Sequence, residues 1–334
     1  MRKRFLTVAL VLAMGFTMIA CGNTQNSSTD NADKNKGANS HYPVTIETCD
    51  QTGKQIKETF KEKPKAVITT NQPPTELLLT LGLGDCMVGT SFKDNEILPN
   101  LKEAYDKIPV LSKEYPSKEV VLDKHPDFIF GWSSVFSDKN LGSVETWNEK
   151  GVNTLIQTNS GSIKDKTLDN VYKDISNVGK IFDIEDKANK LIDSMKNTVS
   201  DIEKKVNESG KEKPKVLIIE GENNEYFAYG KNSLAGNLVE KAGGVNIVDK
   251  GCNVSREVII DKNPDAIILI HYDMQKSELQ GVSALKDDAA LKNVNAIKNN
   301  KIIYTPLTET YAGGIRSIDG IKRFAKGFYP DLFK

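Results

Sequence analysis

The segment SKEVVLDKHPD at 117–127 is nearly repeated as SREVIIDKNPD at 255–265, with seven identical residues in eleven positions. A second short match precedes each copy, because EKPK occupies both 62–65 and 212–215. Chance similarity of amphipathic segments accounts poorly for two matches in the same order. The sequence therefore predicts an internal duplication, with a repeat longer than the solenoid units of about 20–50 residues.

Each copy has the pattern of an α/β unit. A short apolar run follows each EKPK match, as in strands that are buried on both faces of a parallel sheet. The eleven-residue match predicts a short helix that ends before a proline and leads into another apolar strand. We therefore expect an α/β fold of two Rossmann-like lobes with parallel-rich sheets.

The two predicted short helices have further features in common. Leu122 and Ile260 are the apolar residues that we expect to face the core. Glu119 and Glu257 stand in the first turn, where a carboxylate interacts favourably with the positive end of the helix dipole.

The stretch between the two copies predicts one long linker helix. Its apolar residues recur at steps of three and four: Ala188, Leu191, Ile192, Met195, Val199, Ile202 and Val206. From 185 to 206 this helix would be roughly 30 Å long. A coiled coil is disfavoured because the pattern does not last for three or four heptads. We assign 41–165 to the N-terminal lobe, 166–208 to the linker helix region and 209–334 to the C-terminal lobe.

The first 40 residues have the composition of a secretion signal and a tether. A basic start and an uncharged apolar run end at Cys21, which is typical of a signal peptide over 1–20. A cysteine after a small residue at this place predicts cleavage before Cys21 and lipidation of its thiol. An ordinary signal with an incidental cysteine is the alternative. Small and polar residues fill 21–40 and predict a flexible tether, so we expect a lipid-anchored protein on the extracytoplasmic face of the cell membrane.

Charge, cysteine content and motifs disfavour other classes. Lys and Arg number 45, as do Asp and Glu, and no basic block beyond the signal indicates a nucleic-acid partner. The four cysteines, Cys21, Cys49, Cys86 and Cys252, lack the spacing of a metal site. The chain has no nucleophile elbow, HExxH motif or phosphate-binding loop. We therefore do not expect an enzyme.

The order of these segments resembles the helix-linked class of solute-binding proteins that serve ABC importers of iron-siderophores, haem and cobalamin. The resemblance covers about 43–334. It rests on an opening hairpin at 43–60, a strand and helix at 65–82, the two glutamate-containing matches and a last helix at 314–330. It implies a monomer that captures a ferric-siderophore, haem or corrinoid between its lobes and delivers it to an ABC permease dimer with its ATPase. No cofactor is expected besides this ligand.

The resemblance also implies a docking role for two glutamates. Glu119 and Glu257 match the family position on each lobe that contacts arginines of the permease. Like positions on two lobes suit a two-fold partner that presents equivalent basic sites. The alternative is that both residues are only first-turn helix acids, which need no partner.

Candidate ligand residues follow the predicted strands, because ligands of open α/β sheets bind outside the carboxyl ends of the strands. Trp132 offers an aromatic face to a large planar ligand, or is a half-buried loop residue. Arg316 matches a family residue that is directed at an anionic ligand, or pairs with Asp319. The other candidates are Asn71, Tyr115, Tyr226, His271, Tyr272 and Tyr311.

Two other functions stay open from the sequence. A carrier of bare zinc or manganese needs several histidine or carboxylate ligands, but the chain has only three histidines, His41, His125 and His271. A surface enzyme is the second alternative, because 45 acidic residues always include some carboxylate pairs. Among the ligands we favour a ferric-siderophore, because the Arg and Tyr candidates outnumber any clear pair of axial ligands for haem iron.

Overall fold

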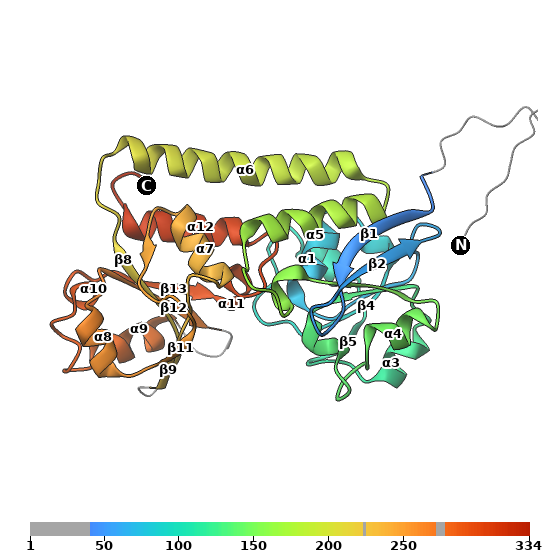
Figure 1. Ribbon diagram of the computed structural model, residues 1–334, viewed down its shortest axis with the longest axis horizontal. Coiled ribbons are helices and arrows are strands. Elements are labelled where there is room, and N and C mark those ends of the chain that lie inside the picture. Colours follow the sequence, from blue (N-terminus) through green and yellow to red (C-terminus); the bar gives the residue numbers. More distant parts are fainter. Residues whose placement is uncertain (1–40, 223–224, 272–277) are drawn as a thin grey trace, which may run out of the picture. The chain divides into compact units, whose positions relative to one another are not determined.

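Two β-sheets organise the fold, one in each half of the chain (Figure 1). The computed structural model describes residues 41–222, 225–271 and 278–334. The N-terminal sheet has five parallel strands in the order β5-β4-β3-β6-β7. They are β3 (Val67–Thr69), β4 (Met87–Ser91), β5 (Val110–Ser112), β6 (Phe128–Gly131) and β7 (Asn153–Ile156). β3 and β6 are fully buried, as expected for central strands of a parallel sheet.

The C-terminal sheet has six strands in the order β11-β9-β8-β12-β13, with β10 also paired to β8. β8, β10, β12 and β13 are parallel, whereas β9 and β11 are antiparallel to their neighbours. The strands are β8 (Lys215–Glu222), β9 (Glu225–Ala228), β10 (Val245–Asn246), β11 (Cys252–Val254), β12 (Ala266–His271) and β13 (Ile302–Pro306). Together the two sheets confirm the prediction of two parallel-rich α/β lobes.

The remaining elements cover and connect these sheets. The expected opening hairpin is the antiparallel pair β1 (Val44–Cys49) and β2 (Gln55–Phe60). The N-terminal lobe also holds α1 (Gln72–Thr80), η1 (Gly84–Cys86), α2 (Lys102–Tyr105), α3 (Lys118–Asp123), η2 (Ser133–Phe136), α4 (Val144–Asn148) and η3 (Thr158–Ser160). The C-terminal lobe holds α7 (Leu234–Lys241), α8 (Arg256–Lys262), α9 (Glu278–Lys286), α10 (Asn295–Lys298), α11 (Leu307–Thr310) and α12 (Ser317–Phe328).

The duplicated segments make equivalent hydrogen bonds in the two lobes. The backbone N–H groups of Lys65 and Ala66 donate to the Asp127 carboxylate at 2.7 and 3.0 Å. In the other lobe the N–H of Lys215 donates to the Asp265 carboxylate at 3.0 Å. Each lysine is the last residue of an EKPK match, and each aspartate is the last residue of an eleven-residue match. The two sequence matches of one lobe therefore bind each other, which explains why they recur together.

The expected orientation of the two short repeat helices was wrong by one residue. Val121 and Ile259 are fully buried, whereas Leu122 and Ile260 are 39% and 44% exposed. One residue turns the side chain by about 100° around a helix axis. In a helix of two turns with several adjacent apolar residues, the sequence pattern therefore leaves the buried face undecided.

The region 166–208 holds two helices, α5 (Leu168–Ile181) and α6 (Glu185–Glu208). The 24 residues of α6 extend over about 36 Å and pack against α5, α7 and α12 (Figure 1). The buried face consists of predicted residues, namely Ala188, Ile192, Met195, Val199, Ile202 and Val206. The linker helix is thereby confirmed, and Asp183, in the left-handed conformation at φ 54°, lies in the turn between α5 and α6.

The N-terminal predictions fall outside the described residues. The signal peptide, Cys21 and the tether belong to 1–40, so the lipid anchor stays a prediction. Among the helices of the described ranges, none combines the length and apolarity that crossing a bilayer requires. Cys49, Cys86 and Cys252 form no disulfide within this part of the chain.

Candidate ligand-binding site

Four aromatic side chains from both lobes meet where the strands of the N-terminal sheet end. Phe92, Tyr115 and Trp132 follow β4, β5 and β6, and Tyr311 follows α11 of the C-terminal lobe. The ring centres of Phe92 and Tyr115 are 4.8 Å apart, and those of Trp132 and Tyr311 are 5.3 Å apart. Phe92 and Trp132, at 6.5 Å, join the two pairs. This aromatic cluster lies at the edge of the sheet where open α/β folds bind ligands.

Hydrogen bonds fix the position of Trp132 in the aromatic cluster. Its indole Nε1 donates to Oε1 of Gln157 at 2.7 Å, and its backbone N–H donates to Oδ1 of Asn71 at 3.0 Å. The Asn71 amide also lies 3.4 Å from the Tyr115 hydroxyl, and Gln157 donates to the carbonyl of Gly313 in the other lobe. The predicted residues Asn71, Tyr115, Trp132 and Tyr311 are thus brought together, with Asn71 as a fully buried support.

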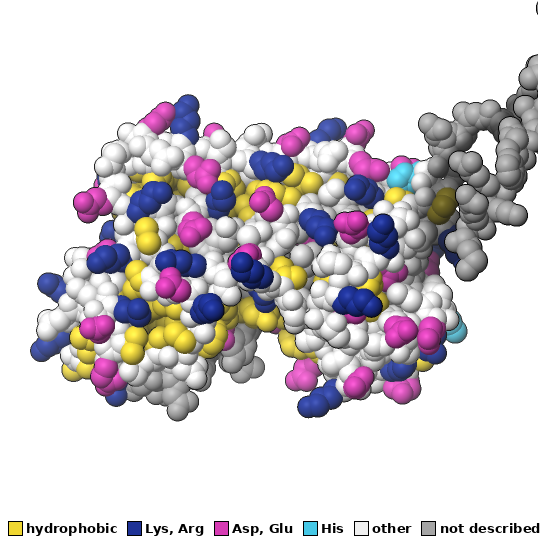
Figure 2. Space-filling model, in the orientation of Figure 1, with side chains coloured by type: hydrophobic (Ala, Val, Ile, Leu, Met, Phe, Trp, Pro, Cys, Tyr) yellow, Lys and Arg dark blue, Asp and Glu magenta, His cyan; other side chains and the backbone are white. Residues whose placement is uncertain are grey.

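A pocket of about 230 Å³ opens beside Tyr311. It is lined by the connecting segment and the C-terminal lobe, including Ile163, Lys166, Phe227, Tyr229, Leu234 and Tyr311. The surface is hollowed between the lobes, with hydrophobic side chains at the border of the hollow (Figure 2). Sites for small molecules usually have about 300–1,000 Å³. The pocket is therefore smaller than most small-molecule sites.

Lys166 supplies a positive charge in this pocket. Its Nζ lies 5.5 Å from the ring centre of Tyr311, and burial lowers its pKa. It forms no ion pair with another described residue. A half-buried ammonium without a carboxylate partner favours an anionic ligand group. The sequence analysis missed Lys166, because nothing in its sequence neighbourhood separates it from a surface lysine.

Two buried polar atoms near the carboxyl end of β4 lack a described partner. Ser91 Oγ, at the end of β4, and Asp94 Oδ2, in the following loop, make no hydrogen bond to any described residue. Buried polar groups normally have hydrogen-bonding partners. Asp94 also raises the pKa of Tyr115 in the aromatic cluster through its charge, after the larger effect of burial. The loop after β4 thus presents polar atoms suited to a ligand.

We expect Asp94→Asn to stabilise the protein above pH 6. Burial raises the pKa of Asp94 to about 6, from 3.8. The unfolded state therefore loses this proton at lower pH than the folded state, and the folded state loses stability as the pH rises from about 4 to 6. At pH 7.5 the free energy of unfolding should rise by up to about 3 kcal/mol, and at pH 4 it should hardly change. Urea unfolding at both pH values measures this.

The exposed acid Asp85 provides the control for this prediction. Asp85→Asn should leave stability within about 0.5 kcal/mol at both pH values. A stabilisation by Asp94→Asn that is equal at pH 4 and 7.5 would contradict the assigned cause.

Arg316 points away from the pocket and into a contact between the lobes. Its guanidinium donates to both carboxylate oxygens of Glu76, on α1, at 2.6 and 2.5 Å, and to the carbonyl of Glu96. Glu76 is 1% exposed, so this pair is buried. The partner is therefore Glu76 instead of Asp319, and the predicted ligand contact of Arg316 would require this ion pair to open.

The other predicted ligand residues of the C-terminal lobe lie elsewhere. Tyr226 packs into the core of that lobe with Leu217 and Val254, because neighbouring residues of a strand point to opposite faces. Phe227, next along β9, is the strand residue that lines the pocket. His271, at the end of β12, stacks on Tyr304 with ring centres 3.9 Å apart. Tyr272 lies outside the described residues.

Glu119 and Glu257 occupy equivalent exposed places on α3 and α8. Hydrogen bonds from its own backbone N–H and from the Ser117 hydroxyl lower the pKa of Glu119. The Ser255 hydroxyl and its own N–H lower that of Glu257. Both carboxylates therefore stay ionised well below neutral pH. The geometry supplies one exposed negative charge on each lobe, in matching local structure.

The histidines do not meet in the aromatic cluster. His41 precedes the hairpin, His125 follows α3, and His271 ends β12. Within the described ranges, the one cluster of three side chains suited to a metal ion is His41, Asp183 and Glu185, outside the pocket. The geometry thus adds no support for a carrier of bare zinc or manganese.

A larger pocket of about 450 Å³ lies at the opposite end of the N-terminal sheet, between 57–64 and 148–153. The buried Glu58 carboxylate in its wall accepts hydrogen bonds from Asn148, Asn153 and Thr154. This end carries the amino termini of the strands, and its buried acid is satisfied internally. We therefore place the ligand at the aromatic cluster.

Two α/β lobes, a long linker helix and an aromatic interlobe site define a solute-binding protein of the helix-linked class. The periplasmic binding protein family matches residues 67–308, and the chain belongs to this family. This class was predicted from the order of the sequence segments.

Known proteins of this kind resemble the chain over nearly its whole length. It is 25% identical to the uncharacterized ABC transporter substrate-binding lipoprotein YvrC of Bacillus subtilis, over 100% of both chains. It is also 25% identical to the petrobactin-binding protein YclQ of the same organism, over 95% of this chain and 96% of YclQ. A periplasmic binding protein from Veillonella parvula has a TM-score of 0.80 and 31% identity, covering 88% of this chain and 93% of that chain.

Proposed function

We propose that this chain is the extracytoplasmic solute-binding lipoprotein of an ABC importer and that it carries a ferric-siderophore as a monomer. The aromatic cluster at the carboxyl ends of β4, β5 and β6 is the observation that carries this proposal. Aromatic faces pack well against large ligands with planar groups. The similarity to YclQ, which is named for petrobactin, a siderophore, supports this ligand class. Haem and a corrinoid are the alternatives.

The charge of the pocket favours an anionic complex. Lys166 brings an ammonium group next to Tyr311, and this group lacks a carboxylate among its described neighbours. Ferric complexes with catecholate groups carry net negative charge, so Lys166 would bind them by direct attraction. Lys166 would then be the basic contact to the anionic ligand, the role that the sequence analysis predicted for Arg316.

Delivery of the ligand would use the surface of α3 and α8. Glu119 and Glu257 place one ionised carboxylate on each helix. Exposed apolar side chains flank them, with Val120 38%, Leu122 39% and Ile260 44% exposed. Charged groups beside apolar contacts are typical of protein interfaces. Such a surface, present once on each lobe, suits a permease dimer with two-fold symmetry.

The anchor and the ATPase complete the proposed cycle. A lipidated Cys21 and a flexible segment of about 20 residues would hold the carrier near its permease, which raises its effective concentration toward the millimolar range. The chain itself would bind and release the ligand without chemical change, and ATP hydrolysis on the partner would drive transport.

A fluorescence-quenching panel tests the ligand class. We expect one ferric-siderophore to quench tryptophan fluorescence with a Kd of about 1 µM or tighter, because Trp132 borders the site. Trp132→Ala should weaken binding at least about tenfold; because this variant also loses the fluorescent reporter, its affinity is measured by calorimetry. Lys166→Met should weaken an anionic ferric complex to a similar extent but leave neutral cobalamin unaffected. The panel contains ferric catecholate and hydroxamate siderophores, haem and cobalamin.

The second tryptophan gives the matched control. Trp147 is fully buried and donates to the carbonyl of Leu141 within the N-terminal lobe. Trp147→Phe should therefore retain both quenching and affinity. Tight binding of zinc at the pocket, with no response to any member of the panel, would overturn the proposed ligand class.

A further inference from the structure

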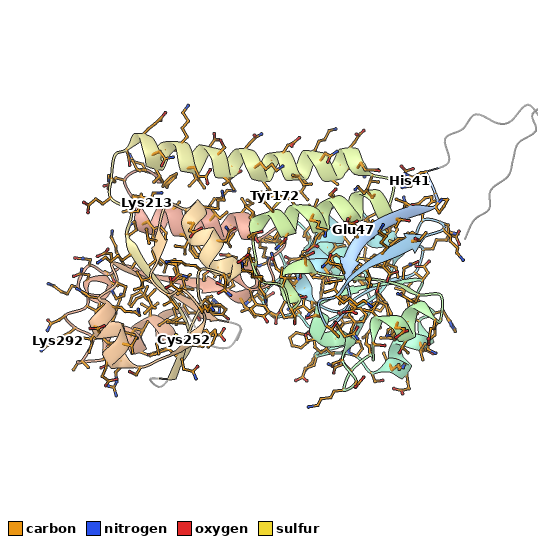
Figure 3. All side chains as sticks on the ribbon, in the orientation of Figure 1. His41, Glu47, Tyr172, Lys213, Cys252 and Lys292 are labelled. Atoms are coloured by element: carbon orange, nitrogen blue, oxygen red, sulfur yellow. The ribbon has the colours of Figure 1, made fainter. Side chains whose placement is uncertain are left out.

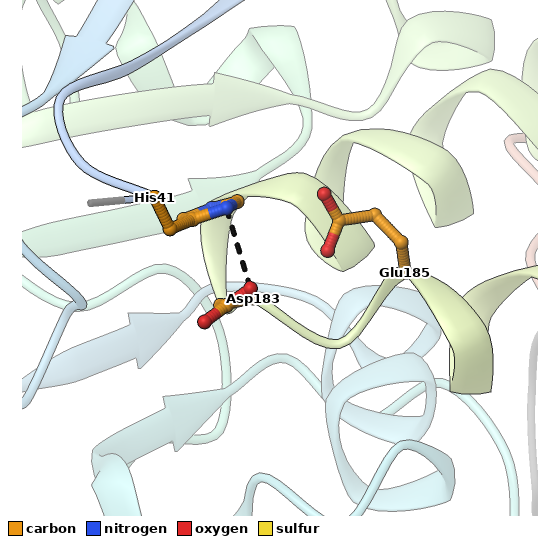
Figure 4. Close-up of side chains that lie close together, drawn as sticks. All are labelled: His41, Asp183 and Glu185. Atoms are coloured by element: carbon orange, nitrogen blue, oxygen red, sulfur yellow. Dashed lines mark ion pairs between the residues drawn. The ribbon is translucent and has the colours of Figure 1, made fainter. Parts of the chain in front are cut away.

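Three potential metal ligands meet at the turn between α5 and α6, away from the aromatic cluster. One ligand atom from each of His41, Asp183 and Glu185 lies within 4.8 Å of the other two. Figure 4 shows the imidazole and both carboxylates directed toward one another. His41 belongs to the segment before the hairpin, whereas Glu185 is the first residue of α6. The group thus joins two parts of the chain that are distant in sequence.

The backbone fixes which nitrogen of His41 faces the carboxylates. Nε2 lies 2.6 Å from the carbonyl oxygen of Lys180, which can only accept a hydrogen bond. Nε2 must therefore carry the hydrogen, and a neutral imidazole then has only a lone pair on Nδ1. Nδ1 faces Oδ1 of Asp183 at 3.3 Å. The Nδ1 lone pair and the carboxylate oxygen can both only accept a hydrogen bond. Their close approach therefore requires either a second proton on the ring or a cation between them.

The distance between these atoms also fits a metal ion. Nδ1 of His41 and Oδ1 of Asp183 are 3.3 Å apart. Two ligand atoms at about 2.0–2.1 Å from a tetrahedral zinc ion lie about 3.3–3.4 Å apart. Histidines that bind metals also commonly donate the other ring N–H to a backbone carbonyl, as His41 does to Lys180.

The residue after His41 also holds this segment in place. The Tyr42 hydroxyl donates to the carbonyl of Ile181 at 2.7 Å, so it also fastens this segment to the end of α5. With a side-chain exposure of 21% for His41 and 58% for Asp183, an ion can reach the site from solvent.

We propose that His41, Asp183 and Glu185 bind a divalent transition-metal ion of the zinc type, with water completing its coordination. One imidazole and two carboxylates are a ligand set that zinc accepts. The ion would be a resident part of the fold and not the transported solute. It would cross-link His41 to the α5–α6 turn and so fix the place where residues 1–40 join the folded unit.

Zinc titration of the purified full-length chain tests this site. The protein should carry Cys21→Ser and Cys252→Ser, because a free thiol also binds zinc; Cys252 is exposed on the C-terminal lobe, far from His41 (Figure 3). We expect one equivalent of Zn²⁺ by calorimetry, and Co²⁺ should give the visible absorption of a tetrahedral ion. His41→Ala, Asp183→Asn and Glu185→Gln should each weaken binding at least tenfold.

Two variants serve as matched controls. His125→Ala removes another exposed histidine, and Asp186→Asn removes the acid next to Glu185; both should retain full affinity. Equal zinc binding by wild type and His41→Ala would overturn the proposal. So would absence of zinc binding by wild type, which would leave a protonated His41 paired with Asp183. Neither result depends on the siderophore panel, because that panel reports on the aromatic cluster.

Discussion

Replacing Arg316 by methionine should lower the free energy of unfolding by about 3–5 kcal/mol. Removal of one partner leaves the other as an uncompensated buried charge, and Glu76 is 1% exposed. Arg316 makes two hydrogen bonds to that carboxylate and a third to the carbonyl of Glu96. Urea unfolding at pH 7 measures the loss.

A double-mutant cycle separates this ion pair from lost packing. Glu76→Gln keeps an oxygen for the N–H of Leu98 and the amide of Gln72, which both donate to Glu76 Oε1. In that background Arg316→Met no longer leaves a buried charge, so we expect the double variant to be more stable than Arg316→Met alone. Arg256→Met, whose pair with Asp288 is 3.3 Å long and partly exposed, should cost only about 0–1 kcal/mol.

The same variants decide between the two roles of Arg316. As an interlobe ion pair, Arg316 acts chiefly on stability. As the ligand contact that the sequence predicted, it would act on affinity, and Arg316→Met would weaken siderophore binding while unfolding changed by less than about 1 kcal/mol. That second outcome would contradict the stabilising role of the ion pair with Glu76 and support the ligand contact.

Features with a repeating or local cause could be predicted from the sequence. The steps of three and four between Ala188 and Val206 require a helix that is buried on one face, and α6 has that face. The two longer matches and the two EKPK segments predicted paired lobes by their repetition alone, and in the structure Asp127 and Asp265 accept hydrogen bonds from Lys65 and Lys215. Neither inference needed knowledge of a distant contact.

Features that depend on distant partners could not be predicted. Arg316 and Glu76 are 240 residues apart, so no local sequence pattern predicts their ion pair. Lys166 gains its place in the site only where it meets Tyr311 of the C-terminal lobe, and Phe92 only where the sheet brings it beside Tyr115 and Trp132. Local prediction also failed where two alternatives differ by one residue. Val121 faces the core in place of Leu122. Phe227 lines the pocket in place of Tyr226.

Reversing the charge of Glu119 and Glu257 should abolish transport without affecting the ligand. In Glu119→Lys/Glu257→Lys, two cations would face basic sites of the proposed permease. Like charges across an interface cost several kcal/mol, so we expect at least about 100-fold weaker association. Both residues are exposed on α3 and α8 and belong neither to the aromatic cluster nor to the pocket lining, so siderophore affinity should stay within about twofold. Uptake of radioactive ferric-siderophore by cells, compared with fluorescence quenching of the purified variant, measures the two effects separately.

A permease dimer with two-fold symmetry would depend on both glutamates equally. Because α3 and α8 present matching carboxylates, Glu119→Lys and Glu257→Lys should each reduce uptake, and to similar extents. Glu103→Gln/Glu208→Gln, which removes one exposed acid from α2 and one from α6, should leave uptake unchanged. Loss of uptake in only one single variant would mean that one lobe binds the permease. Normal uptake in the double reversal would mean that both glutamates serve only their helices, where Lys in the first turn costs about 0.3–1 kcal/mol of stability.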